Sequence, residues 1–178
     1  MKTRNGFVSN SSSTSFTFCY KGDGVKPLTD LILNKYRNQF SRSYDEWHCN
    51  ALDVINAIER CFNSKSEFNC VQCNTIDKII LDAQAYLDRI KQDIKEEEAK
   101  KDNGWLLQNA LEHKQETELK IQKLNAIKER GLTTVLVIDF GDNHGEVQGG
   151  YIGYAMDYDG RYIDINSNDL VVFTELNR

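Results

Sequence analysis

The stretch SFTFCY, residues 15 to 20, alternates between two kinds of side chain. Its aromatic residues fall on one face and its smaller residues on the other: Phe16, Phe18 and Tyr20 against Ser15, Thr17 and Cys19. A period of two is typical of a half-buried strand. The following KGDG, residues 21 to 24, places two glycines around an aspartate and is turn chemistry. The sequence therefore predicts a strand near the N-terminus.

The C-terminal part of the chain also reads as strands. TTVLVIDF (133–140) is apolar on both faces, as expected of a central strand covered on both sides. GYIGYAMDY (150–158) and RYIDI (161–165) flank Asp159-Gly160, a favoured hairpin pair. LVVFT (170–174) follows as the last strand. We expect a C-terminal meander, with the N-terminal strand added at its edge.

Two helices are predicted between residues 27 and 62, and they are expected to cover one face of the sheet. Pro27 suits the first turn of a helix that continues to about Phe40. Ser43, followed by Glu46 three residues later, resembles a capping box for the second helix. Residues 63–73 are polar without periodicity, which indicates a loop.

Residues 75–130 predict two long helices that pair as an antiparallel hairpin. Asn74 or Thr75 caps the first helix, KKDNG (100–104) separates the two with Gly104 free to take positive φ, and Gly131 ends the second. Apolar residues recur every three or four positions in the first helix: Ile76, Ile79 or Ile80, Ala83, Leu87, Ile90 and Ile94. The corresponding line in the second helix is Leu107, Ala110, His113 or Lys114, Thr117, Ile121, Leu124 and Lys128. Such narrow lines are marginal on a lone helix, so the helices should pack together, with one end projecting.

These elements predict one α+β domain over residues 1–178, with a small antiparallel sheet packed on helices and 75–130 as a projecting helical hairpin. The net charge of −5 argues against a general nucleic-acid binder. No apolar run approaches the roughly 20 residues that cross a bilayer. The first residues also lack the apolar segment of a secretory signal, so we expect a cytoplasmic location with reduced cysteines.

Four of the five cysteines form the first candidate site. Cys49, Cys61, Cys70 and Cys73 fall within 25 residues, and CVQC (70–73) has the spacing of a zinc knuckle. Four soft ligands could hold zinc, whereas a single knuckle also fits cysteines without metal. Cys61 in particular lies on an apolar helix face, where a buried thiol is ordinary.

The second candidate is the glycine-rich segment DFGDNHGEVQGG, residues 139 to 150. Asp139, Asp142, His144 and Glu146 could bind a divalent cation or share a proton at the end of a buried strand. The alternative is a plain turn, because Asp-Asn-His-Gly is common hairpin chemistry.

The N-terminal stretch RNGFVSNSSSTSF, residues 4 to 16, resembles the start of many small proteins encoded by bacteriophages and prophages. Those proteins share an Arg-x-Gly-Phe-Val-Ser-Asn string followed by serines and a Phe. The resemblance implies a phage-type accessory protein acting in an infected bacterium. The hydroxyl run itself is an ordered loop, a tail that becomes ordered only from Phe16 onward, or a label that another protein binds. Its residues are Ser11, Ser12, Ser13, Thr14 and Ser15.

Two functions follow from these observations. The first is a non-enzymatic binding module that acts on a host or phage protein, since the common nucleotide-binding and hydrolase motifs are missing from the sequence. The alternative is a small metal-dependent hydrolase that uses the 139–146 segment.

Overall fold

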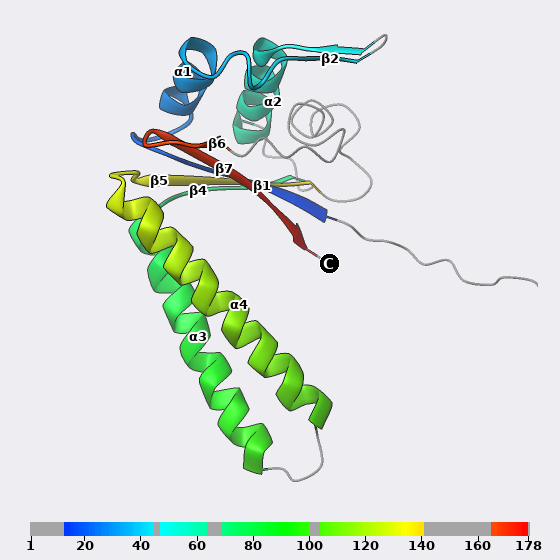
Figure 1. The fold of residues 1–178 in the computed structure, drawn as a ribbon, viewed down its shortest axis with the longest axis vertical. Coiled ribbons are helices and arrows are strands. Elements are labelled where there is room, and N and C mark those ends of the chain that lie inside the picture. The colour runs from blue at the N-terminus through cyan, green and yellow to red at the C-terminus, as the bar shows by residue number, and fades with distance from the viewer. Residues whose placement is uncertain (1–12, 45–46, 64–68, 100–103, 141–164, 178) are drawn as a thin grey trace, which may run out of the picture.

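The computed structural model describes residues 13–44, 47–63, 69–99, 104–140 and 165–177. A five-stranded antiparallel sheet has helices on both faces, and two long helices run away from it (Figure 1). The predicted α+β class with a helical hairpin is confirmed. In spatial order the strands are β4 (Asn69–Thr75), β5 (Thr134–Phe140), β1 (Ser13–Tyr20), β7 (Leu170–Asn177) and β6 (Ile165–Asn166).

The N-terminal strand β1 is the centre of this sheet, so the expectation that it adds at an edge is wrong. It pairs antiparallel with both β5 and β7, and Phe18 lies opposite Leu136 on one side and Val172 on the other. The reason lies in its second face, because Thr17 and Cys19 are as buried as the aromatic residues. A strand covered on both faces belongs in the middle of a sheet rather than at its edge.

The central position of β1 also makes the arrangement of the C-terminal strands differ from the predicted meander. Because β1 separates β5 from β7, these strands do not form a continuous meander. The turn over residues 167–169 joins β6 to β7 as expected. The predicted strand 150–158 and its hairpin with 161–164 lie outside the described residues.

One face of the sheet is covered by α1 (Lys26–Asn34) and α2 (Ala51–Asn63), as the sequence predicts. Phe18 of β1 is fully buried in the same core as Ile32 of α1 and Ile58 of α2. Full burial of each such side chain is worth roughly 1.5–3 kcal/mol. This core is the larger of the two, and it fixes the two short helices on the sheet.

The opposite face packs on the base of the hairpin formed by α3 (Ile76–Ala99) and α4 (Gly104–Glu129). Ile80 and Leu124 lie in one core with Cys19 of β1. Lys128 Nζ lies 2.5 Å from Asp77 Oδ1 and joins the two helices at this base. Beyond the base the hairpin leaves the sheet, with its far end well away from all strands (Figure 1).

Both ends of the hairpin are defined as the sequence predicts. The Thr75 hydroxyl accepts a hydrogen bond from Lys78 N at 3.3 Å, which makes Thr75 the N-cap of α3. Gly131 takes φ +81 immediately after α4 and ends it. Gly104, free to take positive φ, instead begins α4 in helical conformation.

The segment between α1 and α2 differs from the prediction. Helix α1 ends at Asn34 rather than near Phe40. Ser43 lies in β2 (Arg42–Tyr44), which pairs with β3 (Trp47–Cys49), so it does not cap α2. Asn50 is the cap, since its Oδ1 accepts Leu52 N at 2.9 Å, while Asn50 N donates to Asp53 Oδ2 at 2.9 Å. The reciprocal pattern of a capping box is therefore present, but seven residues further along the chain.

Part of the predicted 63–73 loop is strand β4, an edge of the sheet. An edge strand pairs with a neighbour on one side only, and it tolerates polar residues. The polar residues of β4 interrupt the alternation that would have marked it as a strand in the sequence. Thr75 at its end lies opposite Thr134 at the start of β5. The hairpin α3–α4 therefore leaves and re-enters the sheet at one corner.

Gly22 gives a direct test of the turn after β1. It has φ +123, and an added Cβ would lie 2.7 Å from Pro27 Cγ, so a side chain meets both backbone strain and a rigid ring. We expect Gly22→Ala to lower the free energy of unfolding by about 1–3 kcal/mol in urea denaturation. Gly24→Ala is the control, because φ is +69 there but no atom lies within 4 Å. An equal loss in both variants would contradict the contact with Pro27.

Candidate functional site

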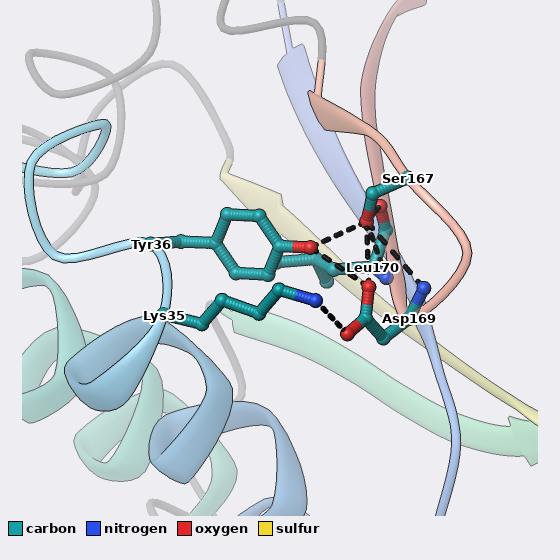
Figure 2. Close-up of polar contacts among 5 residues, drawn as sticks. All are labelled: Lys35, Tyr36, Ser167, Asp169 and Leu170. Atoms are coloured by element: carbon teal, nitrogen blue, oxygen red, sulfur yellow. Dashed lines mark hydrogen bonds and ion pairs between the residues drawn. The ribbon is translucent and has the colours of Figure 1, made fainter.

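A polar cluster joins the end of α1 to the turn between β6 and β7 (Figure 2). Tyr36 Oη lies 2.5 Å from Ser167 Oγ and donates to Asp169 Oδ1 at 2.9 Å. Lys35 Nζ donates to the other carboxylate oxygen, Asp169 Oδ2. We call Lys35, Tyr36, Ser167 and Asp169 the α1–β7 latch.

Each half of the latch is shaped by its local sequence. Lys35 N and Tyr36 N both donate to Leu31 O, at 2.9 and 3.1 Å, so the chain leaves the helix with both side chains directed at the turn. In the turn, Ser167 Oγ accepts from Leu170 N at 3.1 Å. A serine in this role stabilises a tight turn through its own hydroxyl.

The electrostatics of the latch favour a structural role over catalysis. The hydrogen bond from Lys35, and then that from Tyr36, lowers the pKa of Asp169, while the bond to Asp169 raises the pKa of Lys35. A carboxylate with a lowered pKa is a weak base, which leaves the Ser167 hydroxyl without activation by this group. Tyr36 is buried, but the Lys35 side chain is 55% exposed, so water screens the ion pair. The latch holds the α1 end on the sheet.

Two of the four predicted zinc ligands, Cys61 and Cys73, belong to the larger core, which lies between the sheet and the helices α1 and α2. Cys61 is fully buried in α2, and this burial raises the pKa of its thiol. Cys73 is half-buried on β4 with its Sγ 4.0 Å from the Tyr20 hydroxyl. Burial and the neighbouring Cys73 raise the pKa of Tyr20, which therefore stays a neutral donor to Gly24 O at 2.7 Å.

The other two predicted ligands are placed only by their backbone, with Cys49 in β3 and Cys70 in β4. Because β4 is extended, residues 70 and 73 stand about 10 Å apart along it, whereas a zinc knuckle needs a turn. Within the described ranges no three Cys, His, Asp or Glu side chains gather to hold a metal ion. The side chains of Cys49 and Cys70 are not among those described, so the four-cysteine zinc site stays a prediction.

Of the remaining predicted site residues, only some lie within the described part of the chain. Asp139 lies in β5, opposite residue 15 of β1 and residue 70 of β4. Asp142, His144 and Glu146 lie outside the described residues, and so do Ser11 and Ser12. Cation binding by these acidic residues stays a prediction.

The rest of the hydroxyl run forms part of the sheet. Ser13, Thr14 and Ser15 begin β1, and Ser13 and Ser15 lie opposite residues 177 and 175 of β7. Ser15 is in the strand, as the sequence predicts, while Ser13 and Thr14 extend the strand into the predicted loop. A protein that binds them as a label would meet them in the central strand. Recognition of the run stays a prediction.

The hairpin exposes large apolar side chains that sequence periodicity did not identify. Nine large apolar side chains are exposed in the described part of the chain, and six of these belong to the hairpin. The helical spacing of three and four marks only the residues between α3 and α4, and it gives no signal for apolar residues elsewhere on the two helices. The six are Leu81, Tyr86, Trp105, Leu106, Leu111 and Leu119.

The latch predicts a specific loss of stability. Tyr36→Phe keeps the buried ring but removes the hydrogen bonds to Ser167 and Asp169. We expect a loss of about 1–2 kcal/mol in the free energy of unfolding, measured in urea. Tyr86→Phe on the exposed side of α3 is the matched control and should change nothing measurable. Equal stability of the two variants would show that the latch contributes nothing.

The latch also predicts a pH dependence. The folded state lowers the pKa of Asp169, so its contribution is present above the unfolded pKa and is lost as pH falls through the folded pKa. The stability difference between the wild type and Asp169→Asn should therefore shrink below about pH 4. Urea titrations of both proteins at several pH values between about 2 and 7 measure this difference. A difference that is constant over this range would contradict the ion pair.

In the part of the chain that is described, no helix has both the length and the apolar character needed to span a membrane. Comparison with protein-family models, with curated proteins and with solved structures found no match.

Proposed function

We propose that this protein is a non-enzymatic binding module that docks on another protein through the far end of its α3–α4 hairpin. The observation that carries the proposal is Trp105, which is 75% exposed at the start of α4. Leu106 beside it is 40% exposed. Both residues belong to the first turn of α4, and this end of the helix is the one farthest from the sheet (Figure 1).

An exposed tryptophan at this place is more than the scattered apolar surface of any soluble protein. Single exposed apolar residues are common. Tryptophan, however, is enriched among the few residues that dominate binding free energy, because its large ring fills a pocket and loses little entropy. A Trp-Leu pair at the end of a long arm has the form of such an anchor.

The hairpin is also suited to present this anchor in a fixed position. Leu87, Ile90 and Ile94 of α3 are buried along its length, and Thr117 of α4 is buried with its hydroxyl bonded to His113 O at 2.7 Å. A pre-organised surface loses less conformational entropy on binding than a flexible one. The resemblance of residues 4–16 to phage proteins favours a host or phage protein as the partner.

Capture of a partner tests the proposal. We expect the full-length protein, immobilised in mild salt, to retain a stoichiometric partner from a lysate of phage-carrying bacteria. The double variant Trp105→Ala/Leu106→Ala should lose it, because both side chains are already exposed and their removal leaves the fold intact. Circular dichroism checks that the helix content is unchanged.

Leu81→Ala is the control, since Leu81 is 64% exposed on α3 near the sheet rather than at the far end. It should retain the partner. Failure of the wild type to retain any stoichiometric partner, or retention by the Trp105/Leu106 variant, would contradict the proposal.

A further inference from the structure

Helix α4 carries a second uncharged line of residues on the side away from α3. At about 100° per residue, the line is centred roughly 130° around the helix from the residues that face α3. All of its members are exposed, with Leu111 at 41% and Leu119 at 57%. They are Gln108, Leu111, Gln115, Leu119, Gln122 and Ala126, and we call them the outer line.

The outer line has the pattern of a helix-packing face. Its members recur every three or four residues along nearly the whole of α4. The positions beside it are charged, as in Glu112 and Lys123. A helix face that only meets water has no need to keep six successive positions of one line free of charge, and leucine is the residue that helix pairs bury most usefully.

We propose that the outer line packs against the outer line of a second copy of this chain, with the two α4 helices antiparallel. The spacing of its positions, though not their residue types, is nearly the same in both directions around Thr117, so an antiparallel pair brings Gln115 opposite Leu119 of the second copy. The contact then has the self-complementary form that two-fold symmetry requires.

Charge complementarity along one edge of the helix favours this arrangement, whereas on the other edge Glu118 meets its own copy and has Lys114 Nζ of its own chain at 4.0 Å. In an antiparallel pair related by a two-fold axis, each edge of the contact line on one helix lies against the same edge on the other helix. Glu112 then lies beside Lys123 of the second copy, and the pair occurs twice. In its own chain, Lys123 Nζ also lies 3.6 Å from the centroid of the Phe173 ring of β7.

The shape of the chain favours the same direction. The sheet lies at the C-terminal end of α4 (Figure 1). Antiparallel pairing puts the two sheets at opposite ends of the assembly, whereas parallel pairing would bring both to one end. The outer line runs from residue 108 to residue 126, which is about 27 Å of helix.

This surface is separate from the anchor in the proposed function. Trp105 lies about 80° from the centre of the outer line and Leu106 on the opposite side of the helix. Self-association and partner binding can therefore fail independently.

Sedimentation of the full-length protein over a range of concentrations tests the inference. The wild type should approach twice the 20.5 kDa chain mass as concentration rises. Leu111→Glu/Leu119→Glu should remain at the mass of one chain with unchanged helix content, because both leucines are exposed within a chain. Leu81→Glu is the matched control on α3. Trp105→Ala is a second control, which removes the anchor of the proposed function and leaves the outer line intact. Both should keep the dimer.

Charge reversal tests the antiparallel direction. Glu112→Lys should weaken the dimer, and adding Lys123→Glu should restore it at least in part. A wild type that stays at one chain mass at the highest attainable concentration overturns the inference, as does a dimer that survives Leu111→Glu/Leu119→Glu. Absence of any restoration in the Glu112→Lys/Lys123→Glu variant overturns the antiparallel arrangement.

Discussion

The position of β1 between β5 and β7 is the constraint on which the remaining structure depends. Its eight residues supply side chains to two separate cores, with Phe18 under α1 and α2 and Cys19 under the hairpin base. Without β1, neither β5 nor β7 has its central hydrogen-bonding partner. The strands could then not form one sheet with helices on both of its faces.

In this arrangement, one part of the molecule is held by contacts between residues close in the sequence and the other by contacts between residues far apart in the sequence. The hairpin α3–α4 is built from contacts between neighbouring helices, and its length comes from one line of apolar residues on each. The sheet instead needs residues 13–20 to meet both 134–140 and 170–177. Contacts so distant along the chain must overcome a large loop-closure entropy, so packing on both faces has to compensate for it.

The sequence predicted the elements whose signals are local. The alternation in β1, the helical spacing of the hairpin, the Thr75 cap and Gly131 all follow from short stretches. The central place of β1 did not, because a half-buried pattern cannot show that Thr17 and Cys19 are covered from the other side. The latch was also missed, since Lys35 and Asp169 are brought together only by the fold. The outer line of α4 gives only a weak signal in the sequence, because half of its positions are glutamine rather than apolar residues.

The entry and exit of the hairpin at one corner have an evolutionary consequence. Thr75 and Thr134 are direct neighbours in the sheet, so the whole arm occupies the place of an ordinary reverse turn. Natural variation could lengthen, shorten or exchange the arm by whole helical turns while the strands keep their register. Relatives of this protein would then share a common body and differ in reach, which is how one scaffold acquires new targets.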